Sequence, residues 1–170
     1  MTVLETFYPD ITEDSAYDID YEGYYRKGFR GIIYDVDNTL VPHGAPADER
    51  ARALFLRLHR IGYRVTLLSN NKEPRVKSFA EDVIYADYIY KADKPSPKGY
   101  REAMKRMGTT EKNTFFVGDQ PFTDVWGAKN AGILGILVKP IHPKEEIQII
   151  FKRQLEKIVL YFYMRKQKKR

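Results

Sequence analysis

Four polar clusters in this chain of 170 residues contain side chains that can bind a metal ion and a phosphate. Asp35 and Asp37 lie two positions apart at the end of the apolar run 31–36. Carboxylates this close repel each other unless a cation or a proton compensates, so the pair indicates a metal site. Asp119 and Asp124 supply further carboxylate oxygens. A ligand set of oxygen atoms, without His or Cys, favours Mg²⁺ over zinc.

Two further side chains suit the oxygens of a phosphate. Lys94 offers an ammonium group and Ser69 a hydroxyl. Lys98 is the alternative to Lys94, but it lies one turn into a predicted helix, where a lysine faces solvent. An anion held by Mg²⁺, lysine and a hydroxyl, opposite a carboxylate, defines a phosphoryl-transfer site with its own nucleophile.

Simpler interpretations of the same residues stay open. Ser69 and Asn70 can belong to a loop that caps the following helix, and Asp124 can cap the helix after Thr123. His43, beside the first cluster, is interpreted as a solvated loop residue. The chain has no cysteine, which excludes thiolate nucleophiles and Cys-based zinc sites.

The clusters fall where predicted strands end. Short apolar runs predict five strands, at 31–36, 63–68, 84–90, 114–117 and 133–138. Apolar residues at helical spacing predict five helices, at 47–61, 74–83, 97–107 with Ser96 as N-cap, 123–131 and 144–164. Alternating strands and helices indicate the α/β class, with a doubly wound, Rossmann-like parallel sheet. Ligands of such sheets bind at the carboxyl ends of the strands, which is where the clusters lie.

Length and composition fit one domain over residues 1–170. Apolar residues make up 43% of the chain, and no apolar run approaches the ~20 residues that span a bilayer. The expected parts are an acidic segment at 1–28, a catalytic core at 29–143, and a helix with a basic tail at 144–170. The absence of cysteine and of a secretory signal favours a cytoplasmic protein.

The net charge of +6 is a property of the C-terminal end. Residues 151–170 contain eight Lys or Arg and a single acidic residue. A helical apolar stripe in this segment, which includes Leu155, Ile158, Val159 and Phe162, is expected to pack on the sheet. Further aromatic residues and a basic cluster follow, which suits an anionic membrane surface. A solubilising tail or a dimer contact are the alternatives.

The motifs together resemble the haloacid dehalogenase superfamily. Its first motif, DxDx[TV], matches residues 35–39 (DVDNT), and Ser69 in LLSNN resembles the second. Lys94 in KADKP resembles the third motif, and GDQPFTD at 118–124 resembles the fourth.

The resemblance implies a role for each residue. Asp35 would attack phosphorus to form an aspartyl-phosphate, and Asp37 would act as general acid and then general base. Mg²⁺ would be held by Asp35, the Asp37 carbonyl, Asp119 and Asp124. Thr39, Ser69 and Asn70 would position the phosphate, and Lys94 would neutralise charge. The acid at position 37 favours a phosphatase over a mutase, an ion pump or a dehalogenase.

Family caps are inserted after the first motif or before the motif lysine, and neither place has room here. The active site should therefore be open, which suits a substrate carried on a lipid, a protein or a nucleic acid. The segments TFYPD, YDIDYEGYYRKGFRGIIYDVDNTLVP and SNNKEPRVKSFA resemble the YqeG-type subfamily of bacterial phosphatases. The implied substrate is phosphatidylglycerophosphate, because relatives in mitochondria and plastids act on that lipid.

Two alternatives accompany this interpretation. The first is a phosphatase of soluble sugar phosphates or nucleotides whose lid comes from a neighbouring subunit. The second is a scaffold that binds RNA or protein and keeps only a vestigial site. The complete carboxylate set argues against the scaffold, and nucleic acid is not the expected partner. The sequence leaves open whether the protein forms oligomers and whether it lies peripherally on the inner face of a membrane.

Overall fold

The computed structural model of the protein describes residues 2–142 and 147–168, with the backbone alone at 147–151. The strands are β1 (Ile11–Glu13), β2 (Gly31–Tyr34), β3 (Arg64–Leu68), β4 (Ala86–Ile89), β5 (Thr114–Gly118) and β6 (Leu134–Val138). The α-helices are α1 (Tyr21–Arg26), α2 (Glu49–Ile61), α3 (Glu73–Val83), α4 (Lys98–Met107), α5 (Trp126–Asn130) and α6 (Ile147–Gln167). A 3₁₀ turn, η1 (Val3–Phe7), and a π-helical turn, η2 (Pro121–Val125), complete the described elements.

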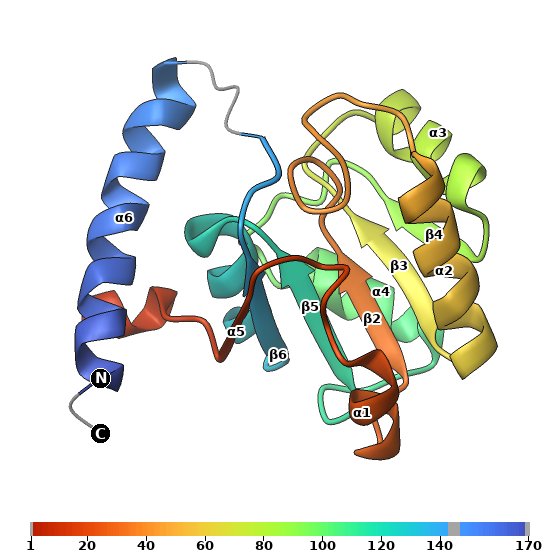
Figure 1. Cartoon of the computed structure of the whole chain (residues 1–170), viewed down its shortest axis with the longest axis horizontal. Helices are drawn as coiled ribbons and strands as arrows, with labels where there is room; N and C mark the ends of the chain where they lie inside the picture. The colour runs from red at the N-terminus through yellow and green to blue at the C-terminus, as the bar shows by residue number, and fades with distance from the viewer. Residues whose placement is uncertain (1, 143–146, 169–170) are drawn as a thin grey trace.

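The strands form one parallel sheet in the order β1-β6-β5-β2-β3-β4. The chain winds outward from β2 through β3 to β4, and then returns to the other side of β2 to lay down β5 and β6 (Figure 1). The direction of winding therefore changes between β2 and β5. Such a switch point leaves a crevice at the carboxyl ends of the two strands, where ligands bind.

Both faces of the sheet are buried, which explains the continuous apolar runs of its strands. In β2, Ile32 and Tyr34 pack on one face and Ile33 on the other. Helices α2 and α3 cover the first face with side chains such as Phe55 and Phe79. Helices α4 and α5 cover the second, so the α/β doubly wound fold is confirmed.

The sheet has six strands, one more than the five predicted. The additional strand, β1, pairs with β6 along the edge, where Ile11 lies opposite Ile136. It escaped prediction because its three residues, ITE, carry no apolar run. The acidic N-terminal segment also packs on the core, since Ala16, Ile19 and Tyr21 are buried.

Two predicted helices differ in detail from the observed ones. The segment 123–131 forms η2 and then α5, because the chain winds as a π-helix from Pro121 to Val125 before it continues as an α-helix. The helix predicted from residue 97 has Pro97 as its N-cap, and the Ser96 hydroxyl accepts a long hydrogen bond, 3.5 Å, from the Lys98 amide at the start of α4.

Helix α6 turns a different face to the protein from the one predicted. Glu156, Val159 and Tyr163 are buried, whereas Leu155, Ile158 and Phe162 are exposed by 44%, 52% and 43%. The prediction that these last three pack on the sheet was wrong. The buried face of α6 is the one that contacts the N-terminal segment. Tyr163, for example, packs edge-to-face on Tyr8. The predicted start of this helix, 144–146, lies outside the described residues, and no described helix is long and apolar enough to cross a membrane.

Candidate active site

The site begins where β2 ends, beside the switch point of the sheet. The Asp35 amide still donates to the Val117 carbonyl of β5 at 2.9 Å, so Asp35 is held in line with the sheet. Three residues on, Asn38 adopts a left-handed conformation with φ of 62° and donates its amide to the Val41 carbonyl at 2.7 Å. Asparagine tolerates this conformation better than most residues. The resulting tight turn presents Asp35 and Asp37 to different surroundings.

Three buried carboxylates converge at this point. Oxygen atoms of Asp35, Asp119 and Asp124 lie within 4.8 Å of one another, and the residues are exposed by 7%, 2% and 1%. The ammonium of Lys94 donates to Asp35 Oδ1 and to Asp124 Oδ1, each at 2.8 Å. Lys94 is thus the lysine of the cluster, and its alternative Lys98 is exposed on α4.

Burial sets the electrostatics of the cluster. Desolvation raises the pKa of Asp35 well above its ordinary value; Lys94 opposes this effect, and Asp124 and Asp119 add to it. Desolvation and the neighbouring Asp124 likewise raise the pKa of Asp119 to about 6. Burial works against the charged form of Lys94, but the carboxylates of Asp124 and Asp35 outweigh it and raise the pKa of the ammonium. The three carboxylates therefore carry more negative charge than Lys94 alone neutralises.

A divalent cation would compensate this excess of negative charge. The donors are carboxylate oxygens from three residues, buried and mutually close, which is the chemistry that Mg²⁺ prefers. Asp35, Asp119 and Asp124 are the residues that could hold the ion. The side chain of Asp37 lies outside this carboxylate group.

Asp37 is held by donors from three different segments. Its Oδ1 accepts from the Gly44 amide at 2.7 Å and from Arg75 Nη2 at 2.9 Å. Its Oδ2 accepts from Asn71 Nδ2 at 2.6 Å. These contacts hold the Asp37 carboxylate beside the cluster but outside the group of Asp35, Asp119 and Asp124.

The three residues expected to position phosphate lie around the cluster. Thr39 Oγ1 donates to Asp119 Oδ1 at 3.3 Å, and the buried Ser69 Oγ accepts from the Asn71 amide at 3.1 Å. Asn70 has a different setting, since its side chain accepts from the Lys94 amide at 2.8 Å and donates to the Lys94 carbonyl at 3.2 Å. The Asn70 side chain therefore positions the loop that carries Lys94.

Asp124 belongs to the carboxylate cluster, and the histidines His43 and His59 do not. Asp124 Oδ2 accepts from the Gln120 amide at 3.1 Å, so this residue both supports the turn and takes part in the cluster. His43 is exposed, and His59 stacks on Tyr85 with ring centroids 3.9 Å apart.

Sequence reasoning missed two arginines at the site. Arg75 in the first turn of α3 donates to Asp37, and Asn71, which donates to the same carboxylate, precedes that helix. Arg153 of α6 donates to Asp119 Oδ2 at 2.8 Å. No local pattern marks Arg153, because it belongs to a basic segment and meets Asp119 only through the tertiary fold.

The site has no inserted cap in the described part of the chain. The connection from β2 to α2, residues 35–48, contains no described helix or strand, and Lys94 follows the end of β4 by five positions. The flanking structure at this edge is α6, whose residues 152 and 153 reach Gln120 and Asp119.

Known proteins share both this sequence pattern and this fold. The sequence profile described as haloacid dehalogenase-like hydrolase matches residues 43–132. The chain is 36% identical over 161 residues to the protein of Bacillus subtilis described as probable phosphatase YqeG, covering 94% of this chain and 93% of that protein. The chain belongs to the haloacid dehalogenase-like hydrolases. It is a phosphatase of this family, of the YqeG type, and so a phosphoric monoester hydrolase.

More distant relatives extend the comparison. Phosphatidylglycerophosphate phosphatase 1 of Arabidopsis thaliana is 29% identical over 175 residues, and the match covers 93% of this chain but 48% of the plant protein. Among solved structures, the cobalt-bound deoxy-D-mannose-octulosonate 8-phosphate phosphatase of Haemophilus influenzae has a TM-score of 0.54. It is 16% identical and the match covers 67% of this chain and 80% of that one, so this likeness concerns the fold alone.

Proposed function

We propose that this phosphatase removes the terminal phosphate of phosphatidylglycerophosphate, in a Mg²⁺-dependent reaction through an aspartyl-phosphate on Asp35. The observation that carries the proposal is the buried carboxylate cluster bridged by Lys94, with Asp37 held separately beside it. Such an arrangement provides a nucleophile, a charge-neutralising cation and an independent acid-base group within one crevice.

In the proposed first step, an Asp35 carboxylate oxygen attacks phosphorus and the bond to the alkoxide leaving group breaks. Asp37 gives its proton to that leaving oxygen. In the second step, Asp37 takes a proton from water as the water attacks the phosphorus of the aspartyl-phosphate, which releases inorganic phosphate and restores Asp35. Lys94 neutralises the Asp35 carboxylate before attack, and Thr39 and Ser69 orient the phosphate.

Asp35, Asp119 and Asp124 would hold the magnesium ion. When bound, Mg²⁺ supplies the positive charge that lets an anionic phosphate approach an anionic nucleophile. Asn71 and Arg75 keep the Asp37 carboxylate aimed at the leaving group by their hydrogen bonds to it.

The lipid substrate is supported by the outer surface of α6, the helix whose Arg153 reaches Asp119. The outer face of α6 exposes four large apolar side chains, at Leu155, Ile158, Tyr161 and Phe162. Arg165 and Lys168 follow on the same helix end and are exposed. Apolar side chains beside basic ones suit an anionic bilayer surface. We place the protein in the cytoplasm, at the inner face of a membrane, on this ground and on the plant relative's described activity.

A soluble substrate is the second candidate. Glyceraldehyde 3-phosphate phosphatase of Pyrococcus abyssi is 29% identical over 98 residues, a match that covers 52% of this chain. This candidate requires a lid from a neighbouring subunit, because the described chain has none. A scaffold without catalysis is disfavoured, since it has no use for the intact cluster.

The experiment that separates the candidates is a phosphate-release assay of the purified protein with Mg²⁺. Phosphatidylglycerophosphate in vesicles of anionic phospholipid is compared with sugar phosphates, nucleotides and glyceraldehyde 3-phosphate. We expect kcat/KM for the lipid to exceed that for each soluble compound by about tenfold or more, because only the lipid uses the surface beside the site. A preference for a soluble compound would reject the lipid substrate.

A further inference from the structure

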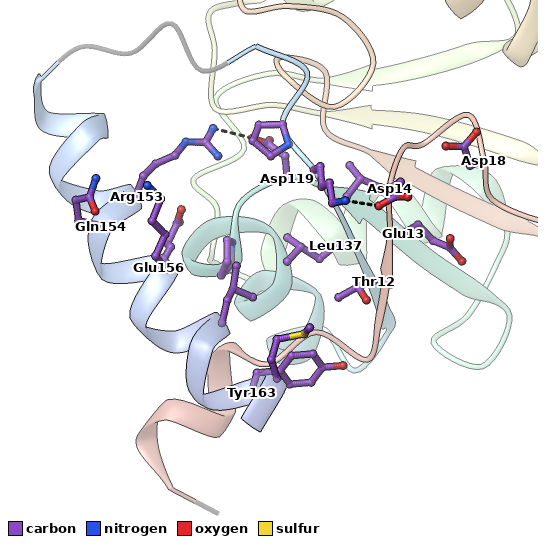
Figure 2. A pocket seen from close by; sticks show the side chains of 17 residues that line it. Thr12, Glu13, Asp14, Asp18, Asp119, Leu137, Arg153, Gln154, Glu156 and Tyr163 are labelled. Carbon is purple, nitrogen blue, oxygen red and sulfur yellow. Dashed lines mark hydrogen bonds and ion pairs between the residues drawn. The ribbon is translucent and has the colours of Figure 1, made fainter. Parts of the chain in front are cut away.

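A groove lies along the inner side of α6, and Asp119 of the carboxylate cluster is among its lining residues. It has a volume of about 830 Å³ and lies between α6 on one side and the β1–β6 edge of the sheet on the other (Figure 2). One end is formed by Asp119 and Arg153, and the other by Tyr163 and Met164. We call it the α6 groove. At its Asp119 end, Arg153 pairs with Asp119 of the carboxylate cluster, whose side chain is fully buried.

The side chains that α6 turns into the groove change character along the helix. Arg153 lies at the active-site end, where it donates to Asp119. Glu156 and Lys157 follow one turn later, and Leu160, Tyr163 and Met164 form the far end. With a rise of 1.5 Å per residue, Arg153 and Met164 lie about 16 Å apart along the axis. Along α6, the groove therefore meets a cation (Arg153), a carboxyl group (Glu156), a second cation (Lys157) and then apolar side chains.

The wall opposite α6 is apolar near its middle and acidic at its rim. Leu137, Val138 and Pro140 contribute the apolar part. Among the rim residues, Asp14 pairs with Lys139 at 2.5 Å, and both side chains are about three-quarters exposed. Glu13 and Asp18 complete this rim. An anionic ligand in the groove would therefore place its charge on the α6 side, near Arg153 and Lys157.

Glu156 marks the middle of the groove as a place for a hydrogen-bond donor. The residue is 3% exposed, and its Oε1 has no hydrogen-bond partner among the described residues. A buried acceptor without a donor is costly, and a ligand that brings a donor removes the cost. A hydroxyl group is the donor that an uncharged glycerol unit offers.

We propose that the α6 groove binds the body of a glycerophospholipid substrate whose terminal phosphomonoester lies at Asp35. This inference rests on the proposed function. The hydroxyl of the head-group glycerol would donate to Glu156, the phosphodiester would lie near Lys157, and the first acyl carbons would contact Leu160 and Met164. The order of groups in such a lipid matches the order of side chains along α6. The groove also falls within the ~300–1,000 Å³ range of ligand pockets, well beyond what a phosphate group alone fills.

The test uses a lipid that stays monomeric, so that binding of the protein to a membrane does not affect the measured KM. Dioctanoyl phosphatidylglycerophosphate below its micellar concentration is compared with glycerol 3-phosphate, which has the same reacting group without the lipid body. The variants are Leu160→Gln and Lys157→Gln, and the matched control is Lys105→Gln on the exposed side of α4. We expect each groove variant to raise KM for the lipid about tenfold, with the control within twofold of the original protein. Circular dichroism verifies that the variants are folded.

Calorimetric binding of the same lipid to Asp35→Asn protein, with and without each groove substitution, gives a second readout. Weaker binding in both groove variants supports the groove even if turnover is slow. Unchanged lipid KM and unchanged binding in Leu160→Gln and Lys157→Gln would overturn the groove and leave the phosphatase chemistry intact. Tight lipid binding without phosphate release would instead overturn the proposed function and support the groove.

Discussion

Lys94 is the residue on which the charge balance of the site depends. It lies between Asp35 and Asp124, at 2.8 Å from each, and is itself buried. A buried ammonium with two carboxylate partners keeps the charge of Asp35 partly compensated. In the proposed mechanism Lys94 would also contact a phosphate oxygen of the substrate from the same position.

Glu156 allows a test of burial and charge at a single residue of the α6 groove. Desolvation raises its pKa from 4.5 to about 7; Lys152 and Arg153 on the same helix oppose this shift, and Asp119 of the facing strand end adds to it. The folded protein therefore binds the proton more tightly than the unfolded chain. A stability penalty appears as the pH rises from about 4.5 through about 7, and it is absent below this window.

We expect Glu156→Gln to remove that pH dependence. At pH 8 the variant should be more stable than the original protein, by up to ~3 kcal/mol, and at pH 5 the difference should be much smaller. Thermal unfolding of both proteins in the presence of a chelator, at the two pH values, measures the effect. An equal difference at both pH values would show that Glu156 is ionised alike in the folded and unfolded states.

At the scale of elements, the turn from β5 into η2 positions the carboxylates. Gly118 ends β5, and a Cβ at this position would lie 2.3 Å from Asp124 Oδ2. The π-helical turn η2 then returns Asp124 beside Asp119, and Asp124 Oδ2 accepts from the Gln120 amide. The glycine is thus required for close approach of a side chain to the backbone, and not for an unusual φ.

Gly118→Ala should consequently displace Asp124 from the cluster. A shift of about 1 Å in the site reduces turnover by about 100-fold, while the buried sheet keeps its structure. Phosphate release and Mg²⁺ binding by calorimetry, together with the circular dichroism spectrum, measure this. A variant that folds, binds Mg²⁺ as tightly as the original protein and turns over normally would contradict the assigned geometry.

The sequence predicts local elements better than their tertiary partners. Five strands and the ends where Asp35 and Lys94 lie were predictable, because buried parallel strands are continuous apolar runs followed by polar residues. The edge strand β1 was not, since three residues of mixed polarity have no periodic signal. Helix α6 is apolar around most of its circumference, so its pattern did not determine which face packs.

At the scale of the whole molecule, the net positive charge comes from one end of the chain. The basic residues that dominate the net charge of +6 are concentrated in the C-terminal segment, whose helix α6 lies beside the β6 side of the sheet and ends close to the N-terminus (Figure 1). The central site chemistry was predictable from four motifs because each follows a strand end. The contact of Arg153 with Asp119 was not, because the two residues are separated by 34 positions and meet only in the folded chain.

The central claim is that the cluster makes Asp35 the nucleophile of a phosphatase. The most direct measurement is the rate of phosphate release by purified protein with Mg²⁺, before and after Asp35→Asn, an exchange that keeps the side chain's size. We predict release by the original protein and a loss of about 10⁴-fold or more in the variant, with thermal unfolding showing that the variant is folded. A folded Asp35→Asn protein that releases phosphate at a rate near that of the original would contradict the account.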